Sequence, residues 1–197
     1  MQRRTKDTTS TTAAAGATPE AATAPGLSGT LLRARTTAPR PSARTLSRRR
    51  LLDRLDVGVQ GAVTVVSGSP GSGKTQLVLD WVASSGTRPT AWVALGEDCN
   101  EPQRLWSLVV TALQRVDTSS ELLRSLRPPA NVDSQFLDQL LLALADLRTP
   151  IVLVLEDVHE LHAREALAGL DLLVGAQPGA VHVVLVTRSD PPLTLHR

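Results

Sequence analysis

The stretch SGSPGSGKTQL, from Ser67 to Leu77, directly follows the apolar run Ala62–Val66. It contains three glycines, one lysine and a threonine, and from Gly68 to Thr75 it matches the pattern G-x-x-x-x-G-K-[ST] without a mismatch. Glycines allow positive backbone φ angles, so successive main-chain N–H groups can turn inward around an anion. The stretch therefore predicts a phosphate-binding loop between a strand and a helix.

Each residue type in this loop suits a bound phosphate. A helix predicted over Lys74–Ser84 would add the positive end of its dipole to the main-chain N–H groups. We expect the Lys74 ammonium group to reach the β- and γ-phosphates of a nucleotide and the Thr75 hydroxyl to ligate Mg²⁺. The candidate nucleotide-binding residues of the loop are Gly68, Ser69, Pro70, Gly71, Ser72, Gly73, Lys74, Thr75 and Gln76.

Apolar runs alternate with amphipathic ones over residues 45–197, which we interpret as one domain. The runs that predict strands are Ala62–Val66, Thr90–Leu95, Ile151–Leu155 and Val181–Val186. Between them, we expect Asn100 to cap one helix, with Pro102 in its first turn, and Asp133 to cap another. A further helix is predicted over Glu160–Val174. Unbroken apolar strands separated by helices are typical of a parallel sheet covered on both faces, so the predicted fold class is α/β, of the P-loop NTPase type.

Residues 1–44 differ from the rest in composition and charge. They are rich in Thr, Ala, Pro, Gly and Arg, with few large apolar side chains, and we predict that they are disordered. Residues 1–50 carry ten Lys/Arg and two Asp/Glu, a balance of +8, whereas residues 51–197 have a balance of −6. A basic segment can contact nucleic-acid phosphates, but no aromatic side chain is interleaved for base stacking. Nucleic-acid binding by this tail remains an alternative function.

Composition excludes several classes of protein. Cys99 is the single cysteine, so an intrachain disulfide is impossible and a reducing compartment is indicated. No run of 18 apolar residues is present to span a membrane, and the basic residues near Met1 lack the apolar segment of a secretory signal. We therefore expect a cytoplasmic location with no membrane partner.

Two further strand ends carry candidate catalytic and metal-binding groups. Glu156 and Asp157 follow an apolar strand, at the carboxyl end where open parallel sheets bind ligands. We expect Glu156 to hold Mg²⁺ and Asp157 to lie near the attacking water. Arg188 ends the fourth strand and is a candidate charge sensor or arginine finger. His159 and His162 lack the further ligands of a zinc site, so structural or switch roles are favoured.

Several motifs together resemble one family, the large ATP-binding LuxR-type transcriptional regulators of the maltose-regulon-activator type, which are signal-transduction ATPases with numerous domains. LSRRRLLDRLD, a predicted short helix, resembles the segment that lies on the adenine side of the nucleotide in this family. SGSPGSGKTQL resembles its phosphate loop, and TAWVALGEDCNEPQRLWSLVVTAL is similar to its most specific stretch. VLVLEDVHEL and VTRSDPPLTLHR resemble its acidic strand and its sensor segment. The resemblance runs from about Leu46 to Arg197.

The resemblance implies an AAA-like domain that binds ATP or ADP with Mg²⁺. It assigns the metal-binding acid to Glu156, the second acid to Asp157 and the sensor to Arg188, and it assigns contacts on the base side to Arg48 and Arg50. The family has an Asp where this chain has Glu156, so the carboxylate lies one methylene further out. Because Mg²⁺ demands near-ideal octahedral geometry, hydrolysis follows less directly than binding.

The predicted function is a regulatory switch, in which Mg·ATP and ADP favour two arrangements of the domain, with slow or no hydrolysis. The resemblance also implies ATP-dependent self-association, and DNA contact through a carboxyl-terminal helix-turn-helix that lies beyond this chain, which we interpret as a truncated nucleotide-binding domain. A small P-loop kinase is the main alternative. It would need a lid with clustered arginines after the third strand, where HELHAREALAGL offers only Arg164.

Overall fold

The computed structural model describes residues 29–41, 48–84, 86 and 88–195. In this part of the chain, four parallel strands form one sheet in the order β1-β4-β3-β2. The strands are β1 (Val63–Ser67), β2 (Thr90–Ala94), β3 (Ile151–Glu156) and β4 (Val181–Thr187). The predicted parallel α/β fold is confirmed, and each strand lies within a residue or two of its predicted range.

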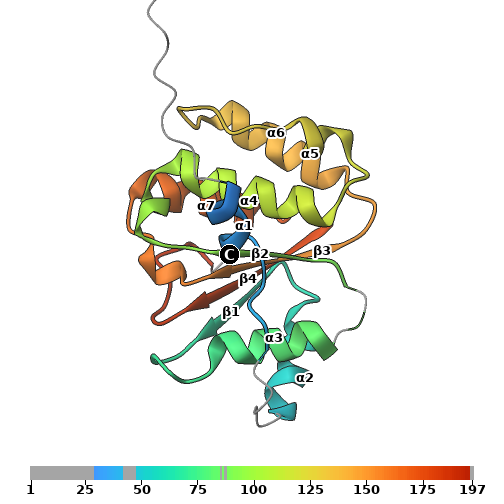
Figure 1. Ribbon diagram of the computed structural model, residues 1–197, viewed down its shortest axis with the longest axis vertical. Helices are drawn as coiled ribbons and strands as arrows, with labels where there is room; N and C mark the ends of the chain where they lie inside the picture. Colours follow the sequence, from blue (N-terminus) through green and yellow to red (C-terminus); the bar gives the residue numbers. More distant parts are fainter. Residues whose placement is uncertain (1–28, 42–47, 85, 87, 196–197) are drawn as a thin grey trace, which may run out of the picture.

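Helices cover both faces of the sheet (Figure 1). One face carries α2 (Arg49–Gly58) and α3 (Lys74–Ser84). The other carries α4 (Pro102–Val116), α5 (Glu121–Ser125), α6 (Ser134–Ala145) and α7 (Arg164–Ala176). Two short 3₁₀ helices, η1 (Glu97–Asn100) and η2 (Val158–Glu160), follow β2 and β3. This double cover explains why the strands read as continuous apolar runs.

Two apolar clusters fill the layers on either side of the sheet. Alternate residues of β3 point to opposite faces, so Val152 and Val154 pack with Trp81 of α3, whereas Leu153 and Leu155 pack with α4 and α7. All residues of β4 are buried. The outer strand β1 leaves Val65 and Ser67 exposed, because it has a strand neighbour on one side only.

The helix that follows η1 begins differently from the sequence prediction. Pro102 is its first residue, as expected, but the capping position is Glu101, and Asn100 does not cap α4. Instead, the Asn100 amide donates to Glu160 O at 2.9 Å, and its oxygen accepts from the N–H groups of His162 and Ala163, both at 2.7 Å. These bonds tie the segment after β2 to the segment after β3.

Hydrogen bonds also determine where two other helices begin. Asp133 caps α6 as predicted, since its carboxylate accepts from the Phe136 N–H at 2.9 Å. The predicted helix over Glu160–Val174 begins later, at Arg164. The reason is that residues 158–160 form η2 and the next N–H groups bond to Asn100.

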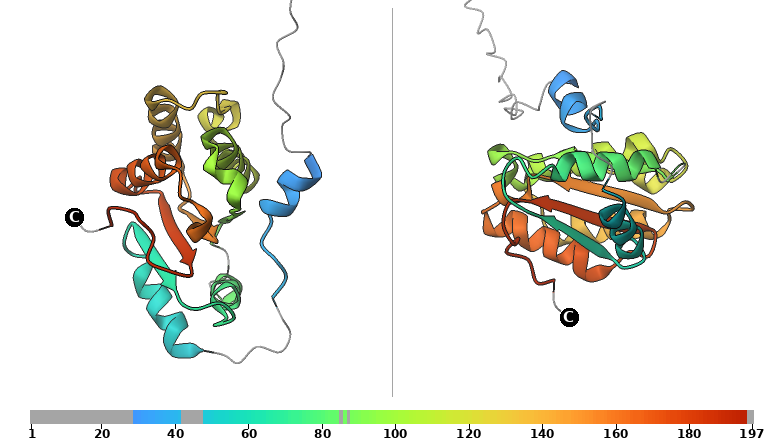
Figure 2. Two further views of the ribbon diagram at one scale, coloured as in Figure 1. Left: turned by 90° about the vertical axis from the view of Figure 1, so that its left-hand side faces the viewer. Right: turned by 90° about the horizontal axis from the view of Figure 1, so that it is seen from below.

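A helix in the amino-terminal segment corrects the prediction of disorder through residue 44. α1 (Gly29–Arg35) lies beside α4 and beyond the β2 edge of the sheet (Figure 2). The Arg35 guanidinium donates to Ala94 O at 2.8 Å and to the Asp98 carboxylate at 2.7 Å. None of the apolar side chains of α1 is fully buried, so the apolar residues of this segment did not predict a helix from the sequence. Residues 1–28 and 42–44 of the predicted tail lie outside the described residues.

Candidate functional site

The loop between β1 and α3 has the backbone of a phosphate cradle. Gly71 and Gly73 have φ angles of 73° and 79°, in the left-handed region that side chains other than glycine rarely adopt. The loop closes with a bond from the Ser72 N–H to Ser69 O at 3.2 Å. α3 then begins at Lys74. The loop therefore lies between a strand and a helix, which is the structural context that supports the sequence motif.

Two cations hold this loop. The Lys74 ammonium group donates to Gly68 O at 2.7 Å and to Ser69 O at 3.0 Å. The Arg48 guanidinium donates to Ser72 O at 2.8 Å, and it lies so close to Gly73 that an added Cβ there would be 3.1 Å from one of its nitrogens. Both cations are therefore positioned against the carbonyl side of the loop.

The two arginines expected on the base side are placed differently. Arg48 contacts the loop and lines a cavity of about 370 Å³ beside it, together with Lys74. Arg50 is exposed on α2 and is not among the residues that line this cavity. Arg54 does line it, one turn further along the helix. Arg50 and Arg54 are four residues apart and share a helix face, so they differ in their position along α2 rather than in the face they occupy. Arg54 belongs to the stretch LSRRRLLDRLD, but the motif assigned no role to it.

The predicted metal-binding residues come together. The Thr75 hydroxyl, at the start of α3, donates a short hydrogen bond to Glu156 Oε1 at the end of β3. The other carboxylate oxygen, Oε2, accepts from the indole N–H of Trp92 at 3.2 Å. Trp92 lies on β2 and is 2% exposed. The sequence motifs include Trp92 but carry no sign that it contacts the acid.

Strand register places Asp157 and Arg188 at the same carboxyl edge of the sheet. Ser67 pairs with Thr187, so Arg188 follows β4 where Gly68 opens the phosphate loop. Arg188 is exposed there. Asp157 follows Glu156 directly and has a left-handed backbone, with φ 58° and ψ 42°. The sharp turn at Asp157 ends the strand and starts η2.

His159 lies between two acids next to this edge. Its ring nitrogens are 3.9 Å from Asp157 Oδ1 and 3.4 Å from Glu160 Oε1. Both nitrogens are buried and have no hydrogen-bond partner within the described residues. Within those residues, no three His, Cys, Asp or Glu side chains group together in a way that could hold a metal ion by themselves.

The roles of the remaining loop residues follow from their positions. Gln76, in the first turn of α3, donates from its side-chain amide to Asp80 Oδ1 at 2.7 Å, one turn further along the helix. The Ser72 hydroxyl is buried and has no hydrogen-bond partner among the described residues. It is a polar group at the centre of the loop with an unused hydrogen-bonding capacity.

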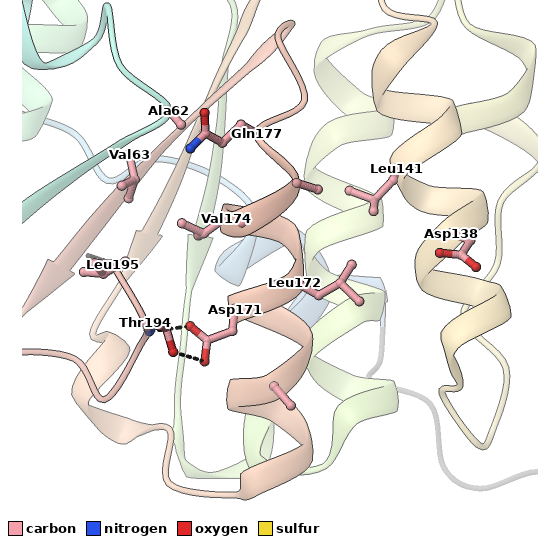
Figure 3. Close-up of a pocket in the computed structure, with 13 residues that line it drawn as sticks. Ala62, Val63, Asp138, Leu141, Asp171, Leu172, Val174, Gln177, Thr194 and Leu195 are labelled. Atoms are coloured by element: carbon pink, nitrogen blue, oxygen red, sulfur yellow. Dashed lines mark hydrogen bonds between the residues drawn. The ribbon is translucent and has the colours of Figure 1, made fainter. Parts of the chain in front are cut away.

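A larger cavity, of about 620 Å³, lies away from the loop between α6, α7 and the start of β1 (Figure 3). The Asp171 carboxylate in this cavity accepts from the Thr194 N–H at 2.6 Å and holds the carboxyl-terminal segment against α7. Among the residues that the structure describes, Asp138 is the other carboxylate in the lining, and no lysine or arginine lines the cavity. Because two carboxylates repel a polyphosphate, this cavity is not a candidate nucleotide site.

The fold and the loop geometry define a P-loop ATPase domain, and comparison with known families agrees. The sequence model of the AAA ATPase domain family matches residues 40–186. Because this is most of the chain, the chain belongs to the AAA ATPase domain family. No helix in the described residues is long and apolar enough to cross a membrane.

Two individual proteins show more specifically what this chain resembles. The HTH-type transcriptional regulator MalT of Serratia proteamaculans (strain 568) is 31% identical over 153 residues, which are 76% of this chain and 17% of that protein. MalT of Cronobacter sakazakii (strain ATCC BAA-894) is 29% identical with the same coverage. The resemblance to regulators of the maltose-activator type is thus confirmed, and the chain spans 17% of the length of these relatives.

A solved structure supports the fold alone. A chain in the structure of Drosophila ORC bound to DNA superposes with a TM-score of 0.50 and 18% identity, covering 90% of this chain and 48% of that chain. At this level of identity, the likeness concerns the arrangement of strands and helices.

Proposed function

We propose that this chain binds Mg·ATP and ADP at the phosphate loop and acts as a switch, with slow or no hydrolysis. The observation that carries the proposal is the hydrogen bond between Thr75, next to the loop lysine, and Glu156 at the end of β3, 81 positions later in the sequence. It brings the two predicted metal-binding side chains to one point beside the loop.

The loop offers matching groups to a phosphate. The Lys74 ammonium group now donates to two neutral carbonyl oxygens, and a phosphate oxygen would replace them with a charged acceptor. Hydrogen bonds to charged acceptors are roughly twice as strong as neutral ones, which favours the exchange. The buried Ser72 hydroxyl, which has no partner among the described residues, supplies a further donor.

The residues around Glu156 fit Mg²⁺. The Thr75 hydroxyl and the Glu156 carboxylate are oxygen ligands, which this cation prefers. When bound, Mg²⁺ neutralises phosphate charge. We propose that Glu156 and Thr75 hold the cation, that Asp157 orients water, and that Arg188 senses the terminal phosphate. The extra methylene of Glu156 relative to Asp is our reason for proposing slow turnover.

Similarity to regulators extends the proposal from binding to regulation. The MalT relatives are HTH-type transcriptional regulators, and we propose that this domain is the ATP-dependent switch of such a protein. A switch requires that ATP and ADP differ in affinity for the two arrangements of the domain. ATP-dependent self-association is its proposed output.

Removal of the loop cation tests nucleotide binding. We expect Lys74→Ala to weaken binding of a fluorescent ATP analogue by about 10–100-fold, because a hydrogen bond to a charged group contributes roughly 1.5–3 kcal/mol and about 1.4 kcal/mol is tenfold. Arg124→Ala, which removes an exposed cation from α5 on the opposite face of the sheet, is the matched control and should bind normally. Equal affinity of Lys74→Ala and wild type in the titration would refute the proposal.

A further inference from the structure

The indole of Trp92 contacts the acid at the proposed metal site from a neighbouring strand. Trp92 pairs with Val154, and Ala94 pairs with Glu156, so Trp92 is the diagonal neighbour of Glu156 on the same face of the sheet. This face is covered by α3, which begins next to Thr75. The indole N–H therefore reaches Glu156 Oε2 at 3.2 Å from inside the apolar layer.

The two donors to Glu156 differ in chemistry. An indole N–H can only donate, so Trp92 cannot accept a hydrogen bond or ligate a cation. A threonine hydroxyl can donate, accept and ligate a metal. Trp92 can therefore only donate to Oε2, whereas Oε1 faces the Thr75 hydroxyl at the start of α3. Both carboxylate oxygens therefore have a donor, but only the Thr75 hydroxyl at Oε1 could change from donor to fellow metal ligand.

A glutamate needs this support more than an aspartate would. Its carboxylate is one methylene further from the main chain and has one more rotatable bond, so its position must be fixed by contacts outside the backbone. Trp92 is itself fixed, because it is 2% exposed and lies in the apolar cluster with Val152 and Val154 of the neighbouring strand. A rigid donor on a buried strand is suited to that task.

We propose that Trp92 is a positioning residue that orients Glu156 and thereby sets how strongly Mg²⁺ enhances nucleotide binding. This inference rests on the proposed nucleotide-binding function and deepens it. Partners that orient a metal ligand typically alter metal affinity by about 10–100-fold when they are removed. The effect belongs to the magnesium-dependent part of binding, because Trp92 lies behind Glu156 and does not line the cavity beside the loop.

The test measures nucleotide affinity with magnesium and with EDTA in four proteins: wild type, Trp92→Phe, Trp81→Phe and Glu156→Ala. Trp81→Phe is the matched control, since Trp81 is buried on the same face but donates to Asp56 Oδ1 at 2.9 Å, away from the acid. We expect Trp92→Phe to lose about 10-fold of the magnesium enhancement and to keep its affinity in EDTA within about twofold. Trp81→Phe should keep both.

A double variant separates positioning from a general loss of structure. In the Glu156→Ala background, Trp92→Phe should cause no further loss of magnesium enhancement, because its route to the metal has been removed. Should Trp92→Phe fail to fold by circular dichroism, benzothienylalanine at position 92 keeps the ring shape, deletes only the N–H and should give the same loss.

The outcomes distinguish the two claims. If wild type binds nucleotide in EDTA and the Trp92 variant keeps the full magnesium enhancement, the role of Trp92 is overturned. The proposed function still stands in that case. An equal further loss in the Glu156→Ala background also overturns it. Absence of nucleotide binding by folded wild type, with and without magnesium, overturns the proposed function and this inference with it.

Discussion

At the scale of single residues, the site depends on side chains that are each fixed by a specific partner. Glu156 has a donor on each carboxylate oxygen, from Thr75 and Trp92. Lys74 and Arg48 are held by loop carbonyls. In the proposed complex, the two donors to Glu156 position its carboxylate before any ligand arrives, which reduces the ordering cost of binding, whereas Lys74 must exchange its carbonyl partners for phosphate.

His182 provides a residue-scale prediction about pH. Its ring lies between β1 and β4, with Nδ1 2.5 Å from Gly61 O and Nε2 3.0 Å from Thr64 Oγ1. Burial lowers the pKa of His182 below its usual value of 6.5; the Gly61 carbonyl opposes this shift, and the positive charge of Arg88 adds to it. The neutral ring, donating to Gly61 and accepting from Thr64, is therefore the folded form.

The sign of the effect follows from which state takes up the proton first. Above pH 6.5 the ring is neutral in both states and the full stability is present; as the pH falls from 6.5 through the lowered folded pKa, the unfolded chain is protonated first and stability is lost. We expect the melting temperature to fall more steeply below pH 6.5 in wild type than in His182→Gln. His162→Gln, at an exposed ring, should resemble wild type. Parallel pH profiles for wild type and His182→Gln would contradict the assignment.

At the scale of elements, α1 is attached to the sheet by polar contacts. Arg35 bonds to Ala94 O, at the end of the edge strand β2, and forms an ion pair with Asp98 in η1. Arg115 of α4 donates to the Thr36 hydroxyl at 2.8 Å. The exposed fraction of the Arg35 side chain is 20%, so these bonds are partly shielded from water. These contacts therefore hold α1 at the carboxyl end of β2.

Loss of the Arg35 contacts should destabilise the domain. We expect Arg35→Ala to lower the free energy of unfolding by roughly 1–3 kcal/mol, because hydrogen bonds to charged groups contribute roughly 1.5–3 kcal/mol and partial exposure of the pair to water weakens them. Arg33→Ala, at an exposed position of the same helix, should change it by less than about 0.5 kcal/mol. Urea unfolding of both variants measures the difference, and a similar small effect for the two would show that α1 contributes little through Arg35.

The same elements show what the sequence could reveal. β3 and β4 were predictable because a strand buried on both faces is apolar along nearly its whole length, with His182 as the interruption in the predicted run of β4. The start of α3 was predictable because the loop motif and the helix share Lys74. α1 was not predictable, because Arg35 attaches it to the rest of the domain. The residues next to Arg35 in the sequence do not indicate that its partner lies 63 positions away. The role of Trp92 also depends on strand register, which is set only when β2 pairs with β3.

At the scale of the whole molecule, the sheet brings distant segments to one carboxyl edge. The phosphate loop follows β1, the acids follow β3 and Arg188 follows β4, while α2 contributes Arg48 from the covering layer. β1 and β3 are separated in the sheet by β4. A ligand that contacts the loop, the acids and Arg188 therefore spans three strands and is sensitive to their relative positions, as a switch requires.

A structure of the chain with excess Mg²⁺ and a non-hydrolysable ATP analogue tests the central claim most directly. We expect the Lys74 ammonium group to leave Gly68 O and Ser69 O for phosphate oxygens, with the Thr75 hydroxyl and the Glu156 carboxylate beside the magnesium ion. A loop without nucleotide under these conditions, with Lys74 still bonded to the two carbonyls, would contradict it.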